Sequence, residues 1–182
     1  RLDHGRRFGK CSSIIEEKWI WTISAPIDSK RITASLADLY DGYPFLILKP
    51  MRILLTGKKG QVGWELNRSL SNLGTVFAMG RSEMDLSKPE TLSPVIQEIK
   101  PDIIINAAAY TAVDKAESEP ELAMTVNGIA PGVIAQEAKK IDAGMIHYST
   151  DYVFDGKATS PYNEEDLTCP LSVYGKSKLA GD

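Results

Sequence analysis

The chain has 182 residues, which is enough for one domain of ordinary size, or for one domain and an appended segment. Apolar residues make up 43% of it and charged residues 25%, and the formal net charge of −3 gives no indication of a nucleic-acid partner. Cys11 and Cys169 are too far apart for a zinc motif, and no apolar run reaches the roughly 18 residues of a membrane span. The composition therefore predicts a globular protein of the cytoplasm, without a membrane partner.

The first fifty residues differ from the rest of the chain in their sequence pattern. They begin without methionine and show no sustained helical period, although residues 35–40 could form a short helix and residues 43–48 a short strand. We interpret residues 1–50 as an appended segment of unknown role, poorly ordered or the remnant of a fused partner. Residues 51–182 then form the domain that carries the function.

This domain begins with a strand, a glycine-rich turn and an amphipathic stretch, in the segment MRILLTGKKGQVG and the residues after it. Ile53–Leu55 is typical of a buried strand, and residues 61–73 are typical of a helix. In dinucleotide folds such a turn sets a pyrophosphate on a helix N-terminus. The first glycine allows the tight turn, the second lets the backbone approach the phosphates, and the third lets helix and strand pack closely. The glycines are Gly57, Gly60 and Gly63.

Apolar strands and helical segments alternate through the remaining chain. The predicted strands are residues 75–79, 102–107 and 144–149, and the predicted helices are residues 89–100 and 117–140, the latter interrupted at Gly128 and Pro131. Ser172 is suited to cap a last helix that the chain end cuts short. This alternation predicts an α/β fold with a doubly wound parallel sheet.

The end of the second strand bears on the coenzyme. An acidic residue there binds the adenosine ribose 2′-hydroxyl of NAD(H), whereas an arginine accommodates the 2′-phosphate of NADP(H). Gly80 and Arg81 follow the strand without an acid, which favours NADPH, with NADH as the alternative. An exposed surface arginine would look the same in sequence.

Tyr174 and Lys178 are the strongest catalytic candidates. They are four residues apart, which places them on the same face of a helix. A lysine ammonium stabilises the phenolate form of a nearby tyrosine, and such a tyrosine can donate a proton to a carbonyl oxygen while hydride reaches its carbon. The pair follows a strand that ends in Ser149 and Thr150, behind the glycine turn.

With these motifs the segment 51–182 resembles the extended short-chain dehydrogenase/reductase superfamily and, within it, the dTDP-4-dehydrorhamnose reductases. The matching stretches are GKKGQVGWEL, NAAAYTAVDKAESEPE, VNGIAPGVIAQEAK, HYSTDYVFDG and PLSVYGKSKLAGD. The resemblance implies a Rossmann-type NAD(P)-binding domain that reduces dTDP-4-dehydro-β-L-rhamnose to dTDP-β-L-rhamnose with hydride from NADPH, in dTDP-rhamnose biosynthesis. It also implies a cytoplasmic enzyme that binds a nucleotide-sugar and can form a homodimer.

The resemblance also assigns roles to residues. Tyr174 would be the catalytic acid, Lys178 would hold the nicotinamide ribose, and Thr150 would bind the sugar C4 oxygen, with Asp151 touching the nucleotide-sugar. The residues implied in coenzyme binding besides Tyr174 and Lys178 are Gly57, Gly60, Gln61, Val62, Gly63, Arg81, Asp85, Leu86, Ala109, Tyr110, Thr111 and Tyr148.

At three further positions a structural role has to be weighed against a functional one. Glu65 matches a glutamate that in some relatives helps to bind Mg²⁺ at a dimer contact, and a surface carboxylate is an equal alternative. Asn127 matches a family asparagine, for which we expect a structural hydrogen-bonding role. His147 lies in an apolar strand, and we expect a packed histidine rather than a catalytic one.

Two other functions stay open at this point. The fold resembles the non-catalytic regulatory subunit of methionine adenosyltransferase, which would make the protein a binding partner, and a 4-ketoreductase for another nucleotide-sugar is the third interpretation. The family pattern continues for about a hundred residues beyond Asp182, so we interpret the domain as C-terminally truncated. We therefore expect these residues alone to be marginally stable and largely inactive.

Overall fold

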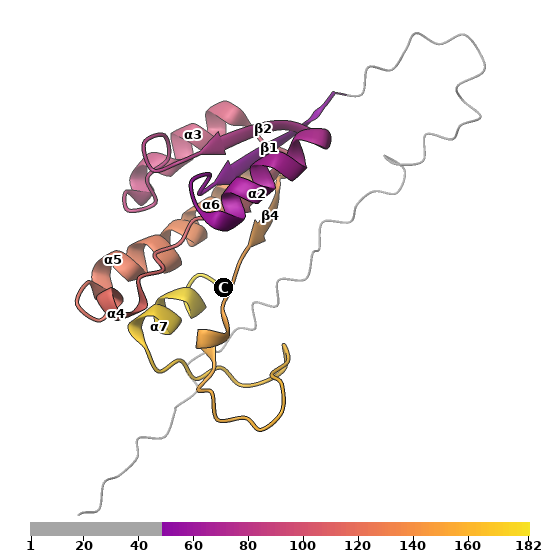
Figure 1. Ribbon diagram of the computed structural model, residues 1–182. Helices are drawn as coiled ribbons and strands as arrows, with labels where there is room; N and C mark the ends of the chain where they lie inside the picture. Colours follow the sequence, from indigo (N-terminus) through magenta and orange to yellow (C-terminus); the bar gives the residue numbers. More distant parts are fainter. Residues whose placement is uncertain (1–48) are drawn as a thin grey trace, which may run out of the picture. The chain divides into compact units, whose positions relative to one another are not determined.

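The computed structural model describes residues 49–182, so the short helix and strand expected within residues 35–48 lie outside the described residues. The centre of the domain is a four-stranded sheet (Figure 1). Its strands are β1 (Met51–Thr56), β2 (Gly74–Met79), β3 (Ile103–Asn106) and β4 (Gly144–His147). They are all parallel and lie in the order β2-β1-β3-β4. The doubly wound parallel sheet predicted from the sequence is confirmed.

The register of the strands sets the geometry of the site. Thr56, the last residue of β1, pairs with Met79 on β2 and with Asn106 on β3. Asn106 in turn pairs with His147 at the end of β4. The carboxyl ends of all four strands therefore lie level at one edge of the sheet, where open α/β sheets bind their ligands.

Helical segments connect the strands and cover the sheet. They are α2 (Gln61–Ser69), η2 (Leu70–Asn72), η3 (Pro89–Thr91), α3 (Leu92–Ile99), α4 (Val113–Ala116), α5 (Pro120–Met124), η4 (Thr125–Ile129), α6 (Ala130–Lys140), η5 (Asp151–Val153) and α7 (Val173–Leu179). Figure 1 shows α4, α5 and α7 together, beyond the carboxyl end of β4.

Alternate residues of β1 point into two separate cores, as the two-residue period of a strand requires. Leu54 packs with Ile104 in a core that includes the buried faces of α3 and α6. Ile53 and Leu55 pack on the opposite face, with Leu66 of α2 beside them. Both faces of the inner strands are therefore covered, which explains why β1 and β3 read as nearly continuous apolar runs.

The predicted helix over residues 117–140 is wrong in its start and in its interruptions. The chain forms the short α4 first, and the long helix begins only at Pro120. It then runs through α5, the π-helical turn η4 and α6 without a break, and Gly128 lies within the π turn. Pro131 directly follows the π turn, whose altered hydrogen-bond pattern accommodates the missing proline N–H within the continuous helix.

The cap predicted for the last helix is confirmed. The Ser172 hydroxyl accepts a hydrogen bond from the Gly175 N–H at 3.0 Å, and α7 then runs to Leu179. The Asp182 N–H still donates to the Lys178 carbonyl at 3.2 Å, so hydrogen bonds of the helical pattern reach the last residue of the sequence. Within residues 49–182, β4 pairs with β3 alone, and its Ile146 side chain is 43% exposed. No helix in this part of the chain is both long and apolar enough to cross a membrane.

Candidate functional site

The glycine turn between β1 and α2 has the shape of an anion cradle. Gly57 has a φ of 76°, and a Cβ there would lie 2.8 Å from backbone atoms of the loop after β3. A Cβ on Gly63 would lie only 2.1 Å from the Gly57 carbonyl oxygen, so this glycine allows α2 to pack on the turn. Gly60 is exposed, and no side chain caps the N-terminus of α2. The first N–H groups of the helix, at Gln61 and Val62, are therefore suited to bind the phosphates of a dinucleotide.

The end of β2 holds an acid that the sequence argument missed. The Glu83 carboxylate accepts the Gly80 N–H at 2.9 Å and pairs with the Lys58 ammonium at 2.8 Å. The hydrogen bond from Lys58 and then that from Gly80 lower the pKa of Glu83 to about 2. Arg81, which we expected to mark this subsite, is largely exposed, and its Nε lies 3.5 Å from Asp85 Oδ1. Lys58 and Glu83 are therefore the charges nearest to the Gly80 position.

Asp85 and Leu86, both predicted to flank the adenine, differ in availability. The Asp85 carboxylate accepts hydrogen bonds from the Ser87 N–H and hydroxyl, and the Ser87 hydroxyl is the main reason why the pKa of Asp85 is lowered. The Leu86 side chain is 5% exposed and packs in the core on the α3 side of the sheet. The Leu86 side chain therefore belongs to the core.

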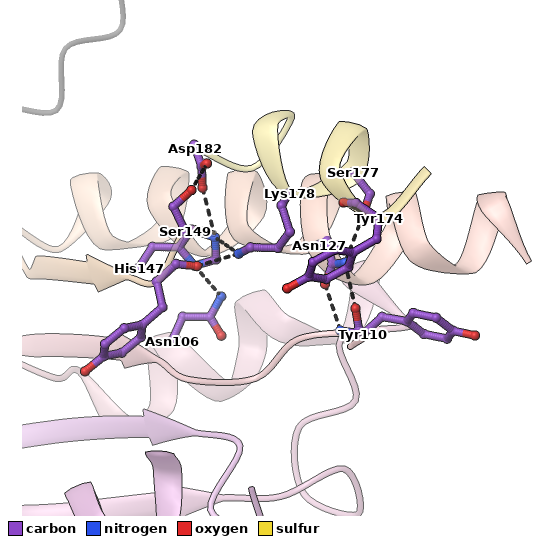
Figure 2. A network of polar contacts seen from close by, with 10 residues as sticks. Asn106, Tyr110, Asn127, His147, Ser149, Tyr174, Ser177, Lys178 and Asp182 are labelled. Carbon is purple, nitrogen blue, oxygen red and sulfur yellow. Dashed lines mark hydrogen bonds and ion pairs between the residues drawn. The ribbon is translucent and has the colours of Figure 1, made fainter. Parts of the chain in front are cut away.

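The loop after β3 contains Ala109, Tyr110 and Thr111 and is fixed by Asn127 of η4. The Asn127 amide accepts the Tyr110 N–H at 2.8 Å and donates to the Tyr110 carbonyl and to the Ser177 hydroxyl, both at 3.0 Å. Asn127 is 1% exposed. The structural role expected for this residue is confirmed, and the amide joins the strand-end loop to α7 (Figure 2).

Replacement of Asn127 by Ala is expected to lower the free energy of unfolding by about 1–3 kcal/mol, because the Tyr110 N–H and carbonyl lose their partner and the Ser177 hydroxyl loses one of its two. Chemical denaturation followed by circular dichroism measures this loss. Gln136→Ala, at an exposed position of α6, is the matched control and should stay within about 0.5 kcal/mol of the parent. Equal stability of the two variants would contradict the proposed joint.

Helix α7 carries the Tyr174 and Lys178 pair. Figure 2 shows the two side chains projecting from the same side of α7, as their spacing predicts. A Cβ on Gly175 would lie 2.2 Å from the Tyr152 carbonyl oxygen, so this glycine allows α7 to lie directly on η5. The Tyr174 ring meets the Tyr152 ring edge-on, with centroids 5.5 Å apart. Close packing of α7 on η5 thus positions the candidate acid.

The Lys178 side chain is buried at the end of β4. It is 2% exposed, and its Nζ donates to the Tyr148 carbonyl at 2.5 Å and lies 3.0 Å from Nε2 of His147. Burial lowers the pKa of Lys178, and the charge of Asp182 opposes this shift. Burial and then the charge of Lys178 lower the pKa of His147 to about 4, so this imidazole is neutral at physiological pH. His147 is packed as expected, but it also contacts the candidate catalytic lysine.

Thr150 and Asp151 lie immediately after β4. The Thr150 hydroxyl accepts the Tyr152 N–H at 3.3 Å and caps η5, and its oxygen lies 3.2 Å from a carboxylate oxygen of Asp151. A depression of about 590 Å³ opens beside these two residues, between them and the segment that contains Tyr162 and Asn163. The predicted substrate residues therefore border a hollow on the open side of the site.

The predicted metal position, Glu65, belongs to no cluster of metal-ligating side chains among the described residues. Glu65 on α2 is largely exposed, and its carboxylate lies 3.4 Å from the Arg68 guanidinium. Within residues 49–182 no group of three or more histidine, cysteine, aspartate or glutamate side chains is arranged to hold a metal ion.

Two polar side chains, one at the end of β3 and one that contacts the residues after β4, were not singled out in the sequence. Asn106 lies between Thr56 and His147, 2.5 Å from the Thr56 hydroxyl and 3.1 Å from the His147 Nδ1. Asp182 accepts a hydrogen bond from the Ser149 hydroxyl. An asparagine that ends an apolar strand was a usable signal for the first, because both faces of that strand are covered. Nothing in the sequence signalled the second.

Known proteins resemble residues 51–182, which match the family model described as the RmlD substrate binding domain. A dTDP-4-dehydrorhamnose reductase of Burkholderia thailandensis is 56% identical over 132 residues, which are 72% of this chain and 44% of that protein. A crystal structure of a dTDP-4-dehydrorhamnose reductase of Clostridium acetobutylicum is 40% identical, with a TM-score of 0.70 over 72% of this chain and 47% of that one.

A dTDP-4-dehydrorhamnose reductase of Bacillus anthracis, solved in complex with NADP, is 36% identical, with a TM-score of 0.69 and the same coverage of 72% and 47%. The chain thus spans about half the length of the relatives it matches. The match extends from the first residue of β1 to the last residue of the chain and includes every part of the site. The resemblance found in the sequence is confirmed, and the chain belongs to the RmlD substrate binding domain family.

Proposed function

We propose that the protein reduces dTDP-4-dehydro-β-L-rhamnose to dTDP-β-L-rhamnose with NADPH, in dTDP-rhamnose biosynthesis. The observation that carries the proposal is the placement of Tyr174 and Lys178 on one side of α7, packed on the segment that holds Thr150. The glycine turn of β1 lies at the same edge of the sheet. The family relatives named for this reaction support the choice of substrate.

In this proposal the residues of the chain orient the sugar and supply a proton. Tyr174 gives its hydroxyl proton to the C4 oxygen of the keto-sugar, and the Thr150 hydroxyl donates a hydrogen bond to the same oxygen. Asp151 contacts the nucleotide-sugar at the mouth of the hollow. The buried Lys178 ammonium stabilises the phenolate that Tyr174 becomes.

The residues at the strand ends fit a bound dinucleotide, which supplies the hydride. Exposed Gly60 and the uncapped N-terminus of α2 hold the pyrophosphate, while Tyr148 and the segment Ala109–Thr111 line the nicotinamide side. We assign Lys58 to the 2′-phosphate of NADPH, because its ammonium lies beside Gly80 at the end of β2. Arg81 adds a second positive charge at the rim.

Replacement of Glu83 by Gln is expected to raise the preference for NADPH over NADH by roughly tenfold, or about 1.4 kcal/mol. The change removes a negative charge beside the 2′-phosphate and releases Lys58 from its ion pair. Fluorescence titration with NADPH and NADH gives the two dissociation constants. Glu90→Gln, an exposed acid on η3, is the matched control and should leave their ratio unchanged. An unchanged ratio in Glu83→Gln would remove Lys58 and Glu83 from coenzyme selection.

The function is tested by following NADPH oxidation in the full-length protein with the keto-sugar nucleotide as substrate. Turnover of this substrate supports the reductase. NADPH binding without turnover would instead favour a regulatory subunit like that of methionine adenosyltransferase. Faster turnover of a different 4-keto nucleotide-sugar would assign the protein to another 4-ketoreductase.

The family membership also supports proposals for the oligomeric state and the cellular location. We assign the enzyme to the cytoplasm and to a homodimer. The exposed Glu65 would take part in a dimer contact with Mg²⁺ only if further carboxylates came from outside residues 49–182. Sedimentation with and without EDTA measures both the dimer and its dependence on the metal.

A further inference from the structure

A line of buried polar side chains crosses the carboxyl ends of three strands and ends at the candidate catalytic lysine. Thr56 and Asn106 are each 1% exposed, the His147 side chain is 13% exposed, and Lys178 is 2% exposed. Each member lies within 3.1 Å of the next. Figure 2 shows the last three of them, with Asn106 below His147 and Lys178 above. The proposed mechanism uses only the lysine, so the other three have no role yet.

The hydrogen bonds of this line have a defined direction. The Thr56 hydroxyl oxygen accepts the Ala108 N–H at 3.3 Å, and the hydroxyl donates its one proton to Asn106 Oδ1. The Asn106 amide therefore turns its Nδ2 group toward His147, where it donates to Nδ1. The reversed amide would leave the Thr56 proton without an acceptor among these groups.

This direction fixes the tautomer of His147. A neutral imidazole carries one proton, and a nitrogen that accepts a hydrogen bond is not the one that carries it. Because Nδ1 accepts from Asn106, the proton lies on Nε2. The Nε2–H group then points at Lys178 Nζ, 3.0 Å away. An ammonium has no lone pair to accept this hydrogen, whereas an amine has one.

We propose that Thr56, Asn106 and His147 form a positioning relay that stabilises the amine form of Lys178 and so sets the pH range in which the lysine gives up its proton. The inference rests on the proposed function and adds positioning residues to it. After Tyr174 has protonated the sugar oxygen, the Lys178 ammonium returns a proton to the phenolate and becomes an amine. The Nε2–H group of His147 donates to that amine until water supplies the next proton.

Burial and the neighbouring charges on and around α7 also affect the protonation of Lys178. Burial of Lys178 favours its amine form, as the relay does, and Asp182 favours the ammonium. Asp182 Oδ1 lies 3.8 Å from His147 Nε2, which is beyond hydrogen-bond distance. The remaining titratable groups on α7 and on the segments packed against it are Tyr148, Asp151, Tyr152, Tyr174, Lys176, Asp114, Lys115, Glu117, Glu119 and Glu121.

Thr56→Val tests the relay with a change of one hydroxyl. Without the Thr56 donor, the amide of Asn106 can rotate and accept a proton from His147 Nδ1. His147 Nε2 then accepts from the Lys178 ammonium, and the pKa of Lys178 rises. Since the ammonium is the form needed for reduction, kcat falls as the pH rises through this pKa. The falling limb of the kcat profile is expected to move upward by about one pH unit, a tenfold change in the protonation equilibrium.

A second measurement does not depend on turnover. Nitrogen-15 NMR of the imidazole is expected to show the Nε2–H tautomer in the parent and the Nδ1–H tautomer in Thr56→Val, with His147→Gln to assign the signal. Thr75→Val, on the exposed side of β2, is the matched control. It should change neither the tautomer of His147 nor the falling limb of the pH profile of kcat. An Nδ1–H tautomer of His147 in the parent overturns the relay. The relay is also overturned if Thr56→Val leaves the tautomer or the falling limb of the pH profile of kcat unchanged. If no keto-sugar is turned over, the proposed function fails. The His147 tautomers measured by NMR then still show whether the relay exists.

Discussion

Tyr174→Phe is expected to lower kcat for the keto-sugar by about 10²–10⁴-fold, the usual contribution of a positioned general acid. The variant removes one oxygen atom and keeps the ring, so the edge-on packing against Tyr152 is preserved. Because the glycine turn and α2 are untouched, the dissociation constant for NADPH is expected to stay within about twofold. Steady-state NADPH oxidation and fluorescence titration measure the two quantities on the full-length protein.

Tyr152→Phe is the matched control for this result. Its ring contacts the Tyr174 ring, so the substitution perturbs the same cluster without touching the candidate acid. It is expected to keep kcat within about threefold of the parent and to leave the unfolding midpoint unchanged. Near-normal turnover in Tyr174→Phe would overturn the assignment of the acid, and an equal loss in both variants would assign the effect to packing.

Gly63→Ala is expected to lower stability and coenzyme binding together. The new Cβ would lie 2.1 Å from the Gly57 carbonyl oxygen and 2.6 Å from the Gly57 carbonyl carbon, both rigid backbone atoms. Either α2 or the turn has to move, which costs about 1–3 kcal/mol or more, as overpacking in a core does. The same movement displaces the N–H groups of the cradle, so NADPH binding is expected to be lost together with stability.

Gly132→Ala provides the control for Gly63→Ala. Gly132 lies in α6, where an added Cβ would meet nothing within 4 Å, and an alanine in a helix is more stable than a glycine by roughly 0.5–1 kcal/mol. Urea denaturation is therefore expected to show opposite changes in the two variants. A Gly63→Ala protein as stable as the parent would refute the close approach of α2 to the turn.

The local features of this domain follow from the sequence alone. The apolar runs of β1 and β3 predict strands covered on both faces, and the spacing of Gly57, Gly60 and Gly63 predicts their separate roles. Ser172 marks the start of α7. Each of these depends on residues only a few positions apart, so propensity, periodicity and capping are sufficient to find them.

The polar contacts of the site are decided by the tertiary structure. Glu83 becomes a charge of the coenzyme site because Lys58, 25 residues earlier in the chain, pairs with it. Pro131 does not end its helix because a π turn precedes it. The line from Thr56 through Asn106 and His147 to Lys178 joins residues 31–50 positions apart. The sequence determines that polar side chains lie at the ends of the strands. Strand register and the packing of α7 determine which of those side chains touch, because hydrogen bonds between distant residues exist only once the sheet has formed.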